Sequence, residues 1–307
     1  MSPFIEVLFE VPKEIAKGLA SGTMVRRGGV IQSTGGEVVA WLRESPEFAR
    51  GASTLSAPVL GQLQSLQMAT GVLAAGQVLT LGFAVVSFAV LNHKLNVLGS
   101  KMDGVLADLA QLKSDVAWLD RRQDIALVAR LRGALDQGNW AYSTGRLEAL
   151  ASVRAVLVEV ELHYAGLLEG MLEARNAHAN AALFGTYQGY LALAAVARAR
   201  CEVGLDGAAA GAPCLRSASK VLVAVDKSFR EPLRNVAAHP ELLRLGAERE
   251  RALSVALPAM KETLRRMEGY ETELNYCAQN RIPLADWEQL GGEEGNGRIA
   301  LLRPKAL

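Results

Sequence analysis

Residues 68–91 read MATGVLAAGQVLTLGFAVVSFAVL, an apolar run without Asp, Glu, Lys or Arg. The run lies inside a longer charge-free segment that extends from Gly51 to His93. A membrane-spanning helix needs about 20 apolar residues to cross roughly 30 Å of hydrocarbon, whereas an apolar stretch of about 10–14 residues is more typical of a buried core helix. The sequence therefore predicts that residues 51–93 are a membrane segment.

The composition is compatible with one membrane element joined to water-soluble domains. Half of the 307 residues are hydrophobic, and the mean hydropathy of +0.15 is high for a soluble protein but low for a transporter with many spans. The formal net charge of +1 gives no global reason to expect a nucleic-acid partner, so an anionic partner would need a local basic patch. The N-terminus has no basic region before its first apolar residues, which argues against a signal peptide.

The residues after the apolar segment have the spacing of a coiled coil. Apolar side chains recur in alternating steps of three and four residues over more than three heptads. The alternative is an amphipathic helix packed on its own domain, for which a wider apolar stripe is expected. We predict a coiled-coil stalk at 94–122 whose oligomer seam is formed by Leu95, Leu98, Met102, Val105, Leu109, Leu112, Val116 and Leu119.

The same spacing continues backwards into the apolar segment and places its polar residues on one face. An amide in hydrocarbon is costly unless it finds a partner or water, and Gln77 on an oligomer axis would have either. One interpretation is a pore that is constricted at an apolar side chain. The other is tight helix packing, with Gly71 and Ala75 allowing close approach. The residues predicted to line a pore are Thr70, Gln77, Thr80, Leu81, Ala84, Ser87 and Phe88.

Short strands and long helices are predicted on either side of these elements. Alternating apolar residues at 4–11, a helix that begins at Pro12, and strands at 24–32 and 37–43 give a small β-α-β-β module over residues 1–45. The turn between the last two strands is expected at residues 33–36. Helices are expected at 125–137, 146–175, 215–238 and 241–279 within a helical regulatory domain that spans 123–280.

Two further segments complete the organisation. Residues 176–197 are free of charge but contain Tyr and Gln, so we predict a buried helix there. Residues 204–213 are rich in Gly and Ala and are predicted to be a linker, while 281–307 form a tail. The predicted fold class is thus mainly α, with a small N-terminal β-α-β-β module, a long transmembrane helix that continues into a coiled coil, and a C-terminal helical bundle domain.

One basic stripe could bind an anion. Its five residues are spaced by 4, 7, 3 and 4, which places them on one side of a helix. Such a stripe fits the phosphates of a nucleotide or single-stranded oligonucleotide, or anionic lipid heads. The alternative is a solvated face paired with nearby acids such as Asp226 and Glu231. The predicted ligand-binding residues are Arg216, Lys220, Lys227, Arg230 and Arg234.

No catalytic motif is present in the sequence. The chain lacks a phosphate-binding Gly-rich loop followed by Lys-Ser/Thr, an HExxH motif and a GxSxG motif. Cys201, Cys214 and Cys277 are odd in number and have no CxxC spacing, and the four histidines are scattered. We therefore expect no enzyme activity, no metal site and no cofactor.

The order of these elements resembles bacterial membrane effectors of antiphage defence, and in particular the channel subunit of the Hailong type. The resemblance is carried by Val11-Pro12-Lys13-Glu14-Ile15 and Arg26-Arg27-Gly28-Gly29-Val30-Ile31 in the N-terminal module, and by Leu91-Asn92-His93-Lys94-Leu95 at the end of the apolar segment. It implies an oligomeric ion channel in the bacterial inner membrane, with soluble domains in the cytoplasm. It also implies that a nucleic-acid signal holds the channel shut until infection opens it and arrests growth.

The leading functional hypothesis is a homo-oligomeric membrane channel gated by its helical domain, with membrane lipid and its own copies as partners. A first alternative is an α-helical pore-forming toxin that inserts only when triggered. A second is a membrane-anchored scaffold whose coiled coil clusters other proteins.

Overall fold

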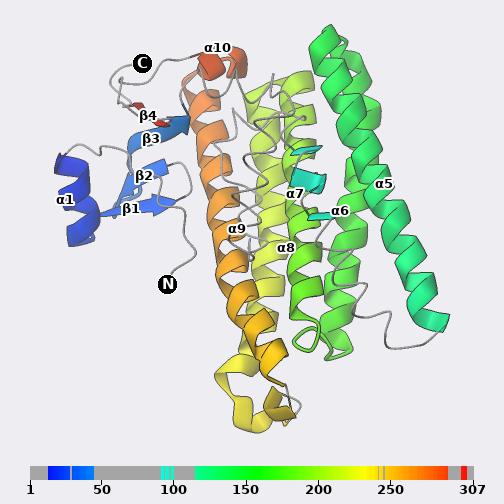
Figure 1. Ribbon diagram of the computed structural model, residues 1–307. Helices are drawn as coiled ribbons and strands as arrows, with labels where there is room; N and C mark the ends of the chain where they lie inside the picture. Colours follow the sequence, from blue (N-terminus) through cyan, green and yellow to red (C-terminus); the bar gives the residue numbers. More distant parts are fainter. Residues whose placement is uncertain are drawn as a thin grey trace, which may run out of the picture.

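The protein is mainly helical, with a bundle of long helices and a small β-sheet beside it (Figure 1). The computed structural model describes residues 13–27, 30–44, 91–92, 94–96, 98–99, 115–240, 242–244, 246–289 and 299–302. The prediction of a mainly α protein is confirmed for these residues.

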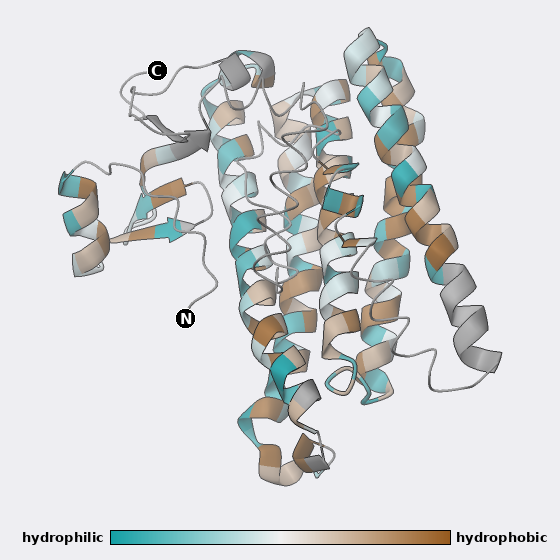
Figure 2. Cartoon of the chain, viewed as in Figure 1, coloured by the Kyte–Doolittle hydropathy of each residue, from teal (hydrophilic) through white to brown (hydrophobic). Residues whose placement is uncertain are grey.

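Five long helices form the bundle. Each packs against the next one along the chain, and α7 in the middle also contacts α5 and α9. α5 and α9 form its two sides in Figure 1, and Figure 2 shows hydrophilic residues along α9. The bounds are α5 Asp115–Thr144, α6 Leu150–Glu173, α7 Ala181–Asp206, α8 Ala208–Arg234 and α9 Ala247–Gln279. Short 3-10 turns occur at Leu147–Ala149, Val236–Ala238 and Leu242–Arg244, and α10 spans Leu284–Gln289.

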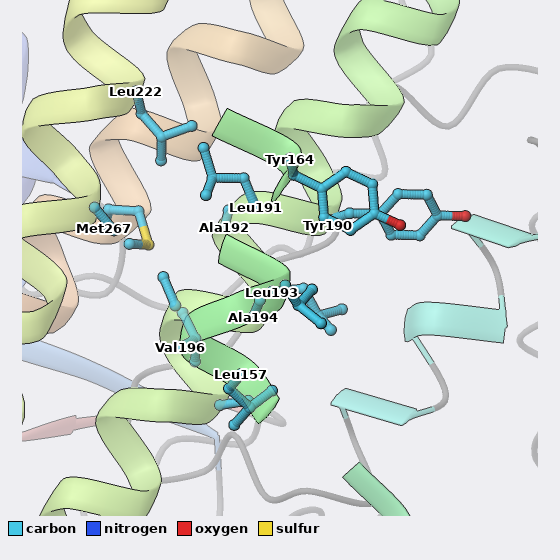
Figure 3. Close-up of a cluster of buried hydrophobic side chains, with 14 of the residues drawn as sticks. Leu157, Tyr164, Tyr190, Leu191, Ala192, Leu193, Ala194, Val196, Leu222 and Met267 are labelled. Atoms are coloured by element: carbon cyan, nitrogen blue, oxygen red, sulfur yellow. The ribbon is translucent and has the colours of Figure 1, made fainter. Parts of the chain in front are cut away.

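The helix α7 is buried on all sides over most of its length. Every residue from Phe184 to Ala197 is buried, including the polar Gln188. No charged residue occurs between Arg175 and Arg198, and the many alanines let neighbouring helices approach closely. Figure 3 shows side chains from α6, α8 and α9 converging on this helix. The prediction of a buried helix at 176–197 is confirmed from Ala181 onward, whereas residues 176–180 lie before the helix begins.

The linker predicted at 204–213 is wrong. α7 continues to Asp206 and α8 begins at Ala208, so only Gly207 separates the two helices. Gly207 has φ of +85°, a conformation that favours glycine, and this single residue reverses the chain. The alanines that follow have the highest helix propensity of any residue, which explains why they extend α8 instead of forming a loop.

The sheet has four antiparallel strands in the order β1-β2-β3-β4. β1 is Met24–Arg27, β2 is Val30–Ser33, β3 is Val38–Glu44 and β4 is Ile299–Leu302. The single strand predicted at 24–32 is therefore two strands. The turn predicted at 33–36 is confirmed: the Gly36 amide donates to the Ser33 carbonyl at 2.9 Å, and Gly36 has φ of +88°.

β4 comes from the predicted tail, at the opposite end of the sequence from its partner strand. Trp41 is opposite Leu302, and Glu44 is opposite Ile299. α1, Lys13–Ser21, packs on the sheet through Ile15, which is buried with residues of β2 and β3. The N-terminal module and the end of the chain thus form one small unit.

An aromatic cluster attaches this unit to the bundle. Trp41 of β3 lies 5.2 Å from Tyr276 of α9 and 5.5 Å from Trp287 of α10, measured between ring centroids. The indole N–H of Trp287 donates to Glu273 Oε1 at 2.7 Å. Both tryptophans are almost fully buried, so the sheet is fixed against α9 and α10.

Another short segment also packs on the bundle. It consists of the described residues between 91 and 99, which are helical, and we call it the anchor segment. Asn92 Nδ2 donates to Asp136 Oδ1, and Arg132 Nη2 donates to Asn96 Oδ1 at 3.0 Å. As the residue number rises by four in the anchor segment it falls by four in α5, so the two run antiparallel.

The predicted long transmembrane helix that continues into a coiled coil is wrong. Within the described ranges, none of the helices combines the length and the apolar character needed to cross a membrane. The anchor segment and α5 are the two ends of the predicted stalk, and because they are antiparallel they do not form one continuous helix. At the two seam positions whose side chains are described, Leu95 and Leu98, the leucines pack in the chain's own core.

Candidate functional site: the anchor segment and its dock

The anchor segment is the point where the charge-free segment 51–93 joins the bundle. Leu91, Leu95 and Leu98 all have 0% of their surface exposed. Their spacing of four and three places them on one face of a helix. All three belong to the main hydrophobic core, so this face is covered completely by the same chain.

Leu98 packs against Gly189 of α7, and we call the surface formed by Gly189, Tyr190 and Tyr164 the dock. Gly189 of α7 has no side chain, and a Cβ there would lie only 3.3 Å from Leu98 Cδ2. Glycine therefore makes the space that Leu98 occupies. Tyr190 of α7 and Tyr164 of α6 are fully buried with ring centroids 5.1 Å apart, and Figure 3 shows both rings directed toward the anchor segment.

A hydrogen bond adjoins the dock. Tyr187, whose ring lies 5.8 Å from that of Tyr164, donates its hydroxyl to Asp124 Oδ2 of α5 at 2.7 Å. Asp124 is 5% exposed, and this bond provides a hydrogen-bond donor to one oxygen of its buried carboxylate. This bond and the ring contact join α5, α6 and α7 at Tyr187, two residues before Gly189.

The dock is electrostatically unfavourable for negative charge. Burial raises the pKa of the Tyr164 hydroxyl far above its ordinary value, and Tyr190 and Asp124 act in the same direction. The Tyr164 hydroxyl is buried and has no hydrogen-bond partner among the described residues. The phenol stays neutral, and the dock presents ring surface to the leucines of the anchor segment.

The residues predicted to line a pore lie outside the described residues. Nothing is placed for Thr70, Gln77, Thr80, Leu81, Ala84, Ser87 or Phe88.

The predicted seam is described in part. Leu95 and Leu98 contact the chain's own core. Val116 and Leu119 fall in α5, where their side chains are not described. Met102, Val105, Leu109 and Leu112 lie outside the described residues.

The five predicted anion-binding residues all lie on α8, but two of them are engaged within the bundle. Arg216 Nε is 2.6 Å from Glu271 Oε1 of α9. Arg230 Nε is 2.7 Å from Asp226 Oδ2, and Arg230 Nη2 also donates to the Leu257 carbonyl at 2.8 Å. Lys220, Lys227 and Arg234 are exposed. The structure thus gives this stripe a role in joining α8 to α9.

Sequence reasoning did not find the dock. Tyr187, Gly189 and Tyr190 lie in the charge-free stretch 176–197, and a glycine between two tyrosines in such a helix is a local sign of close approach by another segment. The sequence around Gly189 does not indicate which segment approaches it, because Leu98 is distant in the sequence. In the described ranges, no group of three or more His, Cys, Asp or Glu side chains could hold a metal ion.

No protein-family model matches this chain, and neither a curated protein nor a solved structure is significantly similar to it.

Proposed function

We propose that this chain is a membrane-acting protein of the triggered kind. Its helical bundle holds the anchor segment, and release of the anchor segment delivers the charge-free residues 51–93 to a lipid bilayer. The observation that carries the proposal is the complete burial of Leu91, Leu95 and Leu98 within their own chain, where that segment ends and directly after it.

The hydrophobic effect favours both environments, which is what a triggered protein requires. Burial of each leucine contributes about 1.5–3 kcal/mol relative to exposure in water. Insertion of an apolar segment into hydrocarbon is favourable for the same reason, and a charge-free segment avoids the cost of a charge in the bilayer. A modest change in the dock therefore shifts the balance between the held and released forms.

This proposal differs from a resident channel in the role of the leucines. A channel seam would use Leu95 and Leu98 between copies of the chain, whereas here both are buried in the chain's own core and Leu98 contacts Gly189. A membrane-anchored scaffold would need no release of the anchor segment. The link to antiphage defence and growth arrest, an anionic oligonucleotide signal and a place at the bacterial inner membrane stay predictions from the resemblance.

The first experiment opens the dock without changing the anchor segment. Gly189→Leu places a side chain where Leu98 lies, whereas Gly166→Leu makes the same change at an exposed position of α6 with no atom within 4 Å of the new Cβ. Purified proteins are mixed with dye-loaded vesicles of phosphatidylethanolamine and phosphatidylglycerol. We expect Gly189→Leu to release dye at least about tenfold faster than the wild type or Gly166→Leu, which corresponds to about 1.4 kcal/mol.

The second experiment holds the anchor segment in place. A short bismaleimide joins Asn96→Cys to Arg132→Cys, whose native side chains are exposed and hydrogen bonded at 3.0 Å between the anchor segment and α5. The three native cysteines stay unreacted because they are buried. The control joins Gln137→Cys to Ser152→Cys, whose native side chains are hydrogen bonded at 3.2 Å between α5 and α6. The first crosslink should abolish dye release and the second should not. Equal release from both crosslinked proteins, or no release from Gly189→Leu, would refute the proposed function.

A further inference from the structure

Four charged side chains form a cluster between α6 and α7. Arg198 Nη1 of α7 donates to Glu161 Oε2 of α6 at 3.1 Å. Arg154 Nη1 of α6 donates to Glu202 Oε2 of α7 at 3.0 Å. Arg198 Nε is also 3.9 Å from Glu202 Oε1 on its own helix. Each carboxylate is therefore bound across the junction between the two helices.

Glu161 is the least satisfied member of the cluster. Its side chain is 11% exposed, and Oε1 is buried with no donor among the described residues. Glu159, two residues earlier on α6, is 56% exposed, and Arg130 donates to both of its oxygens. A buried carboxylate oxygen without a donor costs free energy, and protonation removes most of that cost.

The groups that face Glu161 come from the helices packed on α6. From α7 these are Arg198 and Glu202, and from α8 it is the Cys214 thiol, which donates to Glu202 Oε1 at 3.8 Å. Charged side chains of α5 such as Arg130 bind elsewhere. Burial raises the pKa of Glu161 to about 7, with Arg198 opposing the shift and Glu202 adding to it.

We propose that Glu161 is a proton-operated latch between α6 and α7. Without its proton it binds Arg198 across the junction, but it leaves a buried charged oxygen unsatisfied. With the proton on that carboxyl group the penalty disappears, and Arg198 is free to pair with Glu202 on its own helix. Proton binding thus exchanges a contact between two helices for a contact within one.

The sign of the pH dependence follows from the raised pKa. The folded protein binds this proton more tightly than the unfolded chain, where a glutamate titrates near 4.5. The contribution of the latch to stability is therefore complete below pH 4.5 and is lost as the pH rises toward about 7. The bundle becomes less stable, through this group, as the pH passes through neutrality.

The latch adjoins the dock. Glu161 lies one helical turn before Tyr164 on the same face of α6, and Tyr164 stacks against Tyr190 of α7 at 5.1 Å. The lower stability of the bundle at higher pH would favour release of the anchor segment, and this consequence rests on the proposed function. The latch itself does not.

The test measures the proton directly and then its effect on unfolding. In the wild type, the ¹³C chemical shift of the Glu161 side-chain carboxyl carbon should titrate near pH 7, whereas that of Glu159 should titrate below its ordinary range because Arg130 binds it. In urea unfolding, the unfolding constant of the wild type should rise with pH more steeply than that of Glu161→Gln, by up to about tenfold per pH unit between pH 5 and 7. The unfolding constant of Glu159→Gln should keep the steep pH dependence of the wild type.

Two outcomes would overturn the latch: titration of Glu161 near 4.5, or equal pH slopes for the wild type and Glu161→Gln. The titration is measured on the wild type, so its result is valid even if Glu161→Gln folds poorly. Dye release from vesicles is a separate measurement. A titration near 7 without any dye release would refute the proposed function and leave the latch standing.

Discussion

The contact between Leu98 and Gly189 can be examined by a double-mutant cycle. Leu98→Ala removes the methyl groups that face Gly189, and Gly189→Ala places a Cβ 3.3 Å from Leu98 Cδ2 and 3.4 Å from Cδ1. Each change alone disturbs the dock, but together they are complementary in volume. The alanine methyl at position 189 occupies part of the space that the leucine vacates.

The magnitudes follow from the burial and the distances. Leu98 is 0% exposed, so Leu98→Ala should cost about 2–5 kcal/mol. Gly189→Ala should cost about 1–3 kcal/mol by overpacking, offset by about 1 kcal/mol of helix propensity. In the double variant the overpacking disappears. The coupling energy should therefore be about 1–3 kcal/mol in favour of the double variant, or about 5- to 150-fold in an equilibrium constant.

Native-state hydrogen exchange of the anchor-segment amides reports this local equilibrium. Each single variant should lower the protection of the amides of residues 94–96. The double variant should lower it by less than the sum of the two single effects. The control cycle pairs Leu98→Ala with Gly166→Ala, whose Cβ meets nothing within 4 Å. It should be additive within about 0.5 kcal/mol. Additivity in the Gly189 cycle as well would refute the packing of Leu98 against α7.

Two further predictions concern the bundle. Gly211→Ala should destabilise the protein by about 1–3 kcal/mol in urea unfolding because its Cβ would lie 2.6 Å from Val203 Cγ2, whereas Gly133→Ala, with nothing within 4 Å, should be neutral or stabilising. Arg230→Ala should lower the free energy of unfolding in urea by about 1–2 kcal/mol more than Lys227→Ala does, because Arg230 also binds a carbonyl of α9 and Lys227 is exposed. Equal effects would show that the stripe does not join α8 to α9.

The sequence alone determined several elements because their causes are local. The charge-free stretch 176–197 could only be a buried or membrane helix, and its interruption by Tyr187 and Gln188 favoured burial in protein. The glycine-rich turn at 33–36 fixed the hairpin because Gly36 adopts a positive φ. At Leu95 and Leu98 the three-four spacing also identified a side of the helix that is covered.

The sequence could not determine what covers that side. Spacing states which residues share a face, and a second copy of the chain, a lipid and the chain's own helices all satisfy the same pattern. The tertiary structure buried Leu95 and Leu98 in the chain's own core and placed Leu98 against α7, where Gly189 leaves room. The pairing of β3 with β4 was equally hidden, since strands far apart in sequence carry no local sign of one another.

The environment of Glu161 was decided only by the fold. In the sequence it is one glutamate in a helix, two residues after Glu159, and nothing separates the two. In the structure Arg130 binds both oxygens of one in solvent, while the other is buried with a single arginine. Burial and hydrogen-bond partners set the proton affinity of a carboxylate, and both depend on which helices surround it.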